Sequence, residues 1–183
     1  DRIAAWGIKG IKVDFFATDK QMAIELYLKI LRDAAKNQLL VNFHGCTLPR
    51  GWSRTYPNLL AMEAVRGAEC YRFSATYPEE AARYNTIAPL TRGVTGPTDY
   101  TPVTISDQKY PHKTTAAHEL ALPIIYETGI LHLADTPESY RKMPVEAYNF
   151  LKEIPVVWDE TRLIDAIPGE KFVIARRQGP KWY

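Results

Sequence analysis

The sequence predicts an α/β protein built on a mostly parallel sheet, with a short all-β segment at its C-terminal end. In residues 1–154, apolar segments of strand length alternate with segments of helical period, and this alternation indicates right-handed crossovers between parallel strands. Five strand candidates end on a polar residue, namely Asp14, His44, Glu63, Asp99 and Asp135. After Pro155 the pattern changes to two segments rich in Val, Ile and aromatic residues, which is typical of hairpin strands.

Length and composition exclude several classes of protein. The 183 residues are 46% hydrophobic and 24% charged, which is enough for a sizeable core. The formal net charge of +2, with both signs interspersed, is not the pattern of a nucleic-acid-binding protein. No apolar run approaches the roughly 20 residues of a membrane span. Both ends of the sequence are expected to lie inside a larger protein. The two cysteines, Cys46 and Cys70, leave open whether a disulfide forms.

The first crossover begins with the segment IKVDFF at residues 11–16, which predicts a strand. A helix is expected over residues 18–36, because apolar residues recur there at helical spacing. Thr18 and Gln21 form a capping-box pattern at its start. The segment QLLVNF at residues 38–43 then predicts the second strand of the sheet.

The next two strand candidates are unequal in strength. NLLAMEAV at residues 58–65 predicts a buried strand, whereas VTGPTDY at residues 94–100 contains Gly and Pro and predicts a weaker one. A helix is expected between them, over residues 78–86. Residues 45–57 show no helical period, so we expect a long loop, and long loops inside compact domains are often functional.

The last crossover is predicted from residues 114–154. A helix is expected over residues 114–127, which Pro123 either kinks or ends early. GILHLAD at residues 129–135 predicts a strand. Thr136 and Pro137 are a favourable N-cap and first helical residue for a helix that continues to Ile154.

Two architectures account for polar residues at successive strand ends. In a (β/α)8 barrel the active site lies at the carboxyl ends of the strands, but such a barrel needs about 250 residues. The chain would then be the later part of a barrel. A complete five-stranded doubly wound domain of the flavodoxin type is the other architecture, and it also binds ligands at the carboxyl edge.

Paired carboxyl groups are the strongest chemical pattern. Glycoside hydrolysis uses two carboxyl groups, about 5–5.5 Å apart in retaining enzymes, and Asp14 and Glu69 are placed to form such a pair. Glu63 and Glu69 are also placed to share a hard cation such as calcium, which prefers oxygen ligands. Each acid has a structural alternative as a helix cap or a surface residue.

Other chemistries find less support. His44 and Cys46 lie two residues apart, and no third group is evident to orient them as a nucleophilic pair. The sequence has no CxxC or HxxxH spacing for zinc and no glycine-rich phosphate motif. His118 and His132 lie inside apolar segments and are interpreted as core residues.

The motifs GIKGIKVDFF, VNFHGCTLPRGWSRTYPNLLAMEAVRGAE, TGPTDYTP, HELALPIIYETGILHLAD and FLKEIPVVWDETRLID resemble those of glycoside hydrolase family 97. This family comprises bacterial calcium-dependent α-glucosidases and α-galactosidases. The resemblance runs nearly from end to end. It implies that residues 1–154 are the second half of a (β/α)8 TIM barrel and that residues 155–183 begin a C-terminal antiparallel β domain. It also implies a parent protein that has a further N-terminal domain and is periplasmic or secreted.

The resemblance assigns the catalytic pair. Asp14 matches the nucleophile of the retaining members, at the end of the fourth barrel strand. Gly45 stands where inverting members place a glutamate base directly after the histidine. Both positions therefore point to the retaining branch. Glu69 matches the acid/base residue.

The resemblance also assigns ligands for the ion and the sugar. Glu63 matches a calcium ligand, Glu69 lies close to the ion, and a further glutamate ligand comes from the N-terminal domain. Lys12 and His44 match positions that contact the sugar. The substrate would be an oligosaccharide or another α-glycoside.

The implied reaction is retaining cleavage of terminal α-galactosides or α-glucosides by double displacement. Glu69 must then be protonated at the start, so its pKa is expected to be raised relative to that of Asp14. The main alternative is a truncated, catalytically inactive barrel fragment, and a flavodoxin-like binding domain is the second.

Overall fold

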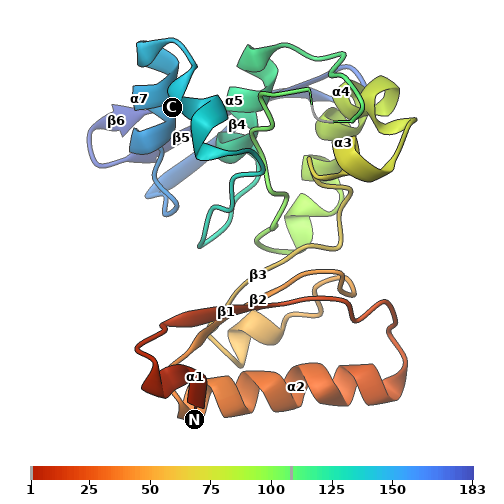
Figure 1. Ribbon diagram of the computed structural model, residues 1–183, viewed down its shortest axis with the longest axis vertical. Helices are drawn as coiled ribbons and strands as arrows, with labels where there is room; N and C mark the ends of the chain where they lie inside the picture. The colour runs from red at the N-terminus through yellow and green to blue at the C-terminus, as the bar shows by residue number, and fades with distance from the viewer. Residues whose placement is uncertain (1, 108) are drawn as a thin grey trace.

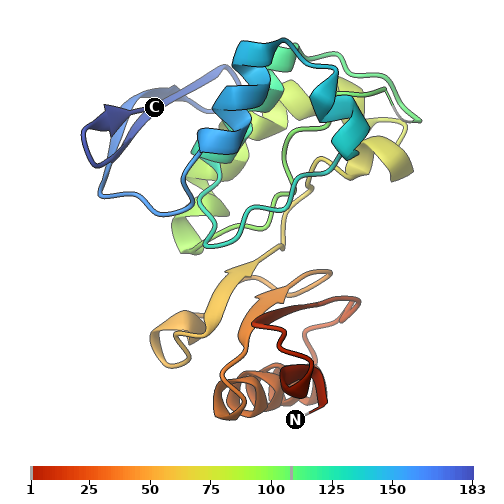
Figure 2. The same cartoon turned by 60° about the vertical axis from the view of Figure 1, so that its left-hand side comes forward.

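The computed structural model describes residues 2–107 and 109–183. Figures 1 and 2 show two parts. The first, up to residue 65, carries a three-stranded parallel sheet and a long helix. The second carries short helices and a three-stranded antiparallel sheet. The chain passes from one part to the other directly after the third parallel strand.

The elements of the first part are α1 (Arg2–Ala5), β1 (Gly10–Val13), α2 (Gln21–Lys36), β2 (Leu40–Phe43), the 3-10 helix η1 (Trp52–Arg54) and β3 (Leu59–Met62). The helices of the second part are α3 (Cys70–Phe73), α4 (Tyr77–Ile87), the 3-10 helices η2 (Ala88–Leu90) and η3 (Gly93–Thr95), α5 (Ala116–Ile125), α6 (Pro137–Arg141) and α7 (Val145–Glu153). Its strands are β4 (Glu160–Ile167), β5 (Lys171–Gln178) and β6 (Lys181–Trp182).

The parallel sheet has the order β1-β2-β3, and α2 lies along one of its faces (Figure 1). Successive side chains of a strand point to opposite faces, so Val41 and Phe43 of β2 pack with the buried face of α2, which includes Tyr27 and Leu31. Asn42 points to the other face, where it is the register partner of Lys12.

The hydrogen-bond ladder continues past the ends of the strands. The His44 N–H donates to the Val13 carbonyl at 2.9 Å, and the Glu63 N–H donates to the Phe43 carbonyl at 2.8 Å. Beyond β3, the Asp99 N–H donates to the Met62 carbonyl at 3.1 Å. The residues that follow each strand are therefore held side by side at the carboxyl edge of the sheet.

The second part has a core rich in tyrosine. Tyr71, Tyr77, Tyr100 and Tyr126 are at most 2% exposed. The hydroxyl groups of Tyr77 and Tyr100 are 2.6 Å apart, and the rings of Tyr100 and Tyr126 stack with centroids 4.2 Å apart. Because buried hydroxyl groups need hydrogen-bond partners, this pairing helps the core to accommodate its polar atoms.

The C-terminal sheet is antiparallel, with the order β4-β5-β6, as the hairpin pattern predicts. Arg176 of β5 connects it to the preceding helices through Glu127, with Nη1 and Oε2 3.1 Å apart. The Gly169 N–H also donates to the Thr86 hydroxyl at 3.0 Å. The domain boundary between residues 154 and 155 stays a prediction.

Two of the five predicted parallel strands do not form in the described residues. Residues 94–100 contribute only an isolated bridge between Met62 and Thr98, and residues 129–135 have no strand assignment. Gly96, inside the first of these candidates, has a φ of 141°, outside the strand region. Thr101 and Val103, directly after it, have φ values of 54° and 66°, so no strand continues there. The result is a mixed α/β fold rather than a complete five-stranded doubly wound sheet, and its place in a barrel stays a prediction.

Two predicted helices differ from the structure, and the early end predicted at Pro123 is confirmed. The helix predicted to begin at Thr18 begins at Gln21, and no side chain caps it. The helix predicted from Thr136 to Ile154 is broken into α6 and α7 because Pro144, which lacks a donor N–H, stands before the second. Pro123 lies inside α5, which ends two residues later. None of the described helices is long and apolar enough to span a membrane.

Candidate active site

The candidate site lies at the carboxyl edge of the parallel sheet, where ligands bind in open α/β sheets. Asp14 directly follows β1, His44 follows β2 and Glu63 follows β3. Glu69 comes from the residue before α3. The strand-end pattern thus predicted three side chains that the sheet does place next to one another.

His44 is the centre of the site and is only 5% exposed. Its Nδ1 atom lies 2.9 Å from Asp99 Oδ2, and its Nε2 atom lies 2.5 Å from Glu69 Oε1. Glu63 Oε1 lies 3.2 Å from the same Nε2 atom. Three carboxylates that are far apart in sequence therefore surround one imidazole.

The charge on His44 follows from these contacts. Burial alone would lower the pKa of His44, because it penalises the charged form. The hydrogen bonds with Asp99 and Glu69, together with the charge of Glu63, instead raise the pKa to about 9. The imidazole is therefore positively charged at neutral pH, and both of its nitrogens donate hydrogen bonds.

Asp99 holds the other side of the site and is 1% exposed. Its carboxylate contacts Lys12 Nζ at 2.8 Å and His132 Nδ1 at 3.0 Å, in addition to His44. Burial opposes the ionised form, but the hydrogen bonds from His132, His44 and Lys12 keep the pKa of Asp99 well below its usual range. The sequence placed Asp99 at a strand end but assigned it no role.

His132 differs from its interpretation as a core residue. Its side chain is 32% exposed, and its Nδ1 atom lies 3.0 Å from Asp99 and 3.2 Å from Asn42 Nδ2. His118 does pair inside the protein, with Asn85 Nδ2 3.0 Å from its Nε2 atom. An apolar sequence neighbourhood does not distinguish these two histidines.

Asp14 and Gly45 are in close contact. A Cβ atom added to Gly45 would lie 2.5 Å from Asp14 Oδ1 and 2.9 Å from the Phe15 nitrogen. Asp14 Oδ1 also accepts a hydrogen bond from the Phe15 N–H at 2.5 Å, and Phe15 has a φ of 67°. The Gly45 N–H donates to Glu63 Oε2 at 2.7 Å. The glycine thus fits between two acidic side chains.

The pKa values of the two glutamates shift in opposite directions. The hydrogen bond with His44 lowers the pKa of Glu69, because it stabilises the carboxylate. Burial raises the pKa of Glu63. The expected difference between the pKa values of Glu69 and Asp14 stays a prediction.

His44, Glu63 and Glu69 are also the group of described residues whose ligand atoms come close enough to hold a metal ion, within 4.8 Å of one another. The carboxylate oxygens of Glu63 and Glu69 fit a calcium site, because calcium takes oxygen ligands. His44 does not fit as a ligand while it is protonated, because a metal needs the free lone pair of the imidazole.

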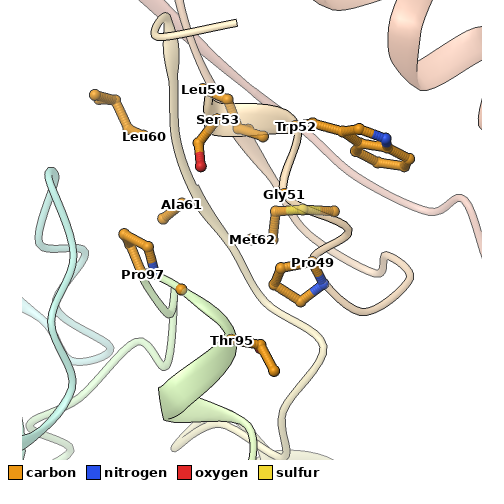
Figure 3. Close-up of a pocket in the computed structure, with 11 residues that line it drawn as sticks. Pro49, Gly51, Trp52, Ser53, Leu59, Leu60, Ala61, Met62, Thr95 and Pro97 are labelled. Carbon is orange, nitrogen blue, oxygen red and sulfur yellow. The ribbon is translucent and has the colours of Figure 1, made fainter. Parts of the chain in front are cut away.

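A cavity of about 240 Å³ adjoins the site, and Lys12, Asn42 and His132 contribute to its wall. A second pocket, shown in Figure 3, has a volume of about 20 Å³ and is lined by Pro49, Trp52 and the residues of β3, among others. That volume holds about one water molecule, so this pocket is too small for a sugar.

The two cysteines do not form a disulfide and are free thiols. Burial raises the pKa of Cys46 to about 11 and also raises the pKa of Cys70. Because the thiolate is the reactive form, neither residue has the character of a nucleophile.

Comparison with known proteins gives the site a family context. Residues 1–65 match the family model described as Glycoside hydrolase 97. Two curated relatives match almost the whole chain. One, named a probable retaining alpha-galactosidase, from Streptomyces bingchenggensis, is 42% identical over 97% of this chain and 27% of its own length. The other, the retaining alpha-galactosidase of Bacteroides thetaiotaomicron, is 36% identical over 98% of this chain and 28% of its own length.

Solved structures agree with this assignment. The crystal structure of a beta-arabinopyranosidase covers 98% of this chain with a TM-score of 0.93 and 37% identity, and the match spans 30% of that chain. A family 97 enzyme from Pseudoalteromonas sp. strain K8, in complex with acarbose, matches with a TM-score of 0.87 and 25% identity, over 98% of this chain and 30% of that one. The chain spans less than a third of the length of each relative, and over that span it is similar to proteins of glycoside hydrolase family 97.

Proposed function

We propose that this chain carries the catalytic residues of a retaining α-glycosidase that acts on terminal α-galactosides. The observation that carries the proposal is the gathering of carboxylates around His44 at the carboxyl edge of the parallel sheet. The names of the two curated relatives favour galactosides over glucosides. A β-L-arabinopyranoside has the ring configuration of an α-galactoside without the CH2OH group, so the arabinopyranosidase neighbour favours the same kind of sugar.

In the proposed reaction Asp14 is the nucleophile and Glu69 the acid/base residue. The Asp14 carboxylate attacks the anomeric carbon while the bond to the leaving oxygen breaks, and Glu69 gives that oxygen a proton. Water then attacks the same carbon, Glu69 takes the proton of the water, and the ester to Asp14 breaks. His44 Nε2 is 2.5 Å from Glu69 Oε1 and is placed to exchange the proton with it.

Lys12 and His44 are the proposed sugar-contacting residues. Both are held by Asp99, through Lys12 Nζ at 2.8 Å and His44 Nδ1 at 2.9 Å. Side chains that are already fixed lose little freedom when a substrate binds, which favours catalysis by positioning. Asp99 therefore orients two groups from neighbouring strands.

Glu63 and Glu69 are the proposed calcium ligands, in keeping with the calcium dependence of the family. A calcium ion takes about six to eight oxygen ligands, so these carboxylates form only part of a site. When bound, the ion supplies positive charge that binds substrate oxygens and offsets the repulsion between the acids.

The test of the proposal is hydrolysis by the full-length protein. We expect release of the aryl group from an aryl α-galactoside, and slower or no release from the aryl α-glucoside and β-L-arabinopyranoside. Asp14→Ala should lower kcat at least about 10³-fold, and azide should restore turnover with a β-galactosyl azide as product.

Asp19→Ala is the matched control, because Asp19 lies on the same loop but has a side chain that is 70% exposed. If Asp14→Ala keeps the activity of this control, Asp14 is not the nucleophile. If the full-length protein hydrolyses none of the three substrates, the proposed function is wrong. The 183-residue chain, assayed alone, tests the alternative of an inactive barrel fragment.

A further inference from the structure

Arg92 is a buried cation close to the candidate site. It lies between η2 and η3 and is 6% exposed. Within the described part of the chain, no carboxylate forms an ion pair with it. A buried charge without a counter-ion is costly unless hydrogen bonds satisfy it. The arrangement of its donors is therefore informative.

All five N–H groups of a guanidinium find an acceptor at Arg92. Nε donates to the Glu63 carbonyl at 3.1 Å, Nη1 to the Gly96 carbonyl at 2.8 Å and the Thr95 hydroxyl at 3.3 Å, and Nη2 to the Met62 carbonyl at 2.6 Å and the Pro97 carbonyl at 3.1 Å. Four of the five acceptors are backbone carbonyl groups. The side chain is thus a cross-link between backbone segments.

The two segments that Arg92 joins are those that carry Glu63 and Asp99. One ends β3 at Met62 and continues directly into Glu63. The other runs through Pro97 to Asp99, and Figure 3 shows Thr95 and Pro97 beside β3. The Met62 carbonyl accepts both from Arg92 and from the Asp99 N–H, at 2.6 Å and 3.1 Å. A single carbonyl thus connects the arginine to the backbone of both acids.

Regular sheet pairing does not hold these segments together. The backbone between them forms only the isolated bridge from Met62 to Thr98. Pro97 has no N–H to donate, and Gly96 has a φ of 141°, outside the strand region. The guanidinium therefore supplies hydrogen bonds that a strand would otherwise supply.

We propose that Arg92 is a positioning residue that fixes Glu63 and Asp99 relative to each other, and through them the carboxylates on both sides of His44. The expected effects on kcat and KM rest on the proposed function. The hydrogen bonds of Arg92 and their effect on the position of the two acids do not depend on it. The planar guanidinium reaches five acceptors in fixed directions, whereas the ammonium group of lysine has three donors on one atom. Lysine keeps the charge and loses the cross-link.

The experiment compares Arg92→Lys and Arg92→Met with Arg176→Lys in the full-length protein. Arg176 is the matched control, because it is 5% exposed and also bonds a backbone carbonyl, that of Ile125. Three readouts are taken: kcat and KM on the aryl α-galactoside, calcium affinity by calorimetry, and the NMR signals of the His44 imidazole in labelled protein.

We expect Arg92→Met to lower kcat about 100-fold with a smaller change in KM, and to weaken calcium binding about 10- to 100-fold. The His44 imidazole signals should move in both Arg92 variants, because the contacts with Asp99 and Glu63 change. Arg176→Lys should lower the melting temperature without altering any of the three readouts.

Several results would overturn the proposal. One is a set of Arg92 variants that lose only thermal stability, with His44 signals and kcat like those of Arg176→Lys. Another is an Arg92→Lys protein that does not fold although Arg176→Lys does, because Arg92 would then serve the whole fold. If the wild-type protein shows neither hydrolysis nor calcium binding, the proposed function fails, and the His44 signals still decide whether Arg92 positions the site.

Discussion

Gly45 is the most tightly constrained single residue of the site. Its φ of 49° lies in the left-handed region, and a Cβ atom there would meet Asp14 Oδ1 at 2.5 Å. Its N–H also holds Glu63. The residue after the central histidine thus needs both the backbone freedom and the small size of glycine.

We expect Gly45→Ala to impair both stability and activity. The left-handed backbone should cost about 1 kcal/mol in free energy of unfolding, and the collision should displace Asp14 and lower kcat/KM about 100-fold. Urea unfolding and hydrolysis of the aryl α-galactoside by the full-length protein measure the two effects.

Gly51→Ala is the control for this variant, because Gly51 has a φ of 78° and nothing within 4 Å of the added Cβ. It should show the backbone cost and keep its activity. Equal activities of the two variants would show that the Gly45 contact does not position Asp14.

The sequence predicted the positions of those site residues that directly follow a strand of the parallel sheet. Asp14, His44 and Glu63 are close together because they follow adjacent parallel strands. Sequence reasoning failed for Asp99, whose hydrogen bond to His44 spans 55 residues, and for His132. It also gave no sign of the hydrogen bond from His44 that lowers the pKa of Glu69, because that contact depends on the fold around α3 rather than on spacing.

At the scale of elements, α5 carries a second buried acid outside the site. Glu119 is 2% exposed, and its Oε2 accepts from the Thr104 N–H at 3.2 Å. Its Oε1 has no hydrogen-bond partner in the described part of the chain and lies 4.0 Å from His112 Nε2. Burial raises the pKa of Glu119 to about 7, despite the Thr104 hydrogen bond.

This buried acid should make stability depend on pH. Because the pKa in the folded state lies above the ordinary value of 4.5, the stabilising contribution is fully present below pH 4.5 and is lost as the pH rises through about 7. The free energy of unfolding of Glu119→Gln, minus that of the wild type, should therefore rise by on the order of 3 kcal/mol between pH 4 and pH 8. Urea unfolding across this range measures it.

Glu146→Gln, at an exposed position of α7, is the control for the substitution itself. A difference between Glu119→Gln and wild type that is constant with pH would mean that Glu119 titrates normally.

Helices and strands were predicted best where the sequence periodicity agrees with the way the element packs in the structure. α2 and the first three strands have strong periodicity, and α2 also packs on the sheet. Residues 94–100 and 129–135 do not form strands, although their composition predicts them. A strand needs a neighbouring strand with which its backbone N–H and C=O groups can pair, and the local sequence does not show whether that neighbour exists. Pro144 carried a local signal for the break between α6 and α7 that helical spacing alone misses.

At the scale of the whole molecule, the chain matches 27% and 28% of the lengths of its curated relatives. Glu63 and Glu69 are the proposed ligands of a calcium ion, which takes about six to eight oxygen ligands. The resemblance to family 97 implies a further glutamate ligand from an N-terminal domain. We therefore expect residues outside this chain to complete the calcium site.

We expect the full-length protein to bind calcium much more tightly than the 183-residue chain. Removing calcium with a chelator should lower its melting temperature and its activity, because saturation at 100 times the dissociation constant stabilises by about 2.7 kcal/mol. Calorimetric titration of both proteins, and melting curves with and without chelator, test this expectation. Glu63→Gln should abolish the chelator effect, and a chelator effect that survives in this variant would place the calcium site elsewhere.

The contact between Asp14 and Gly45 has a consequence for how this family diverges. If inverting members carry a glutamate at the second position, the two acids compete for one volume, so the exchange cannot proceed safely one residue at a time. An ancestor that first gained the glutamate would have crowded the aspartate, and one that first lost the aspartate would have lacked a nucleophile. In the proposed assignment these two positions are therefore linked, and intermediates between the two lineages should be catalytically poor.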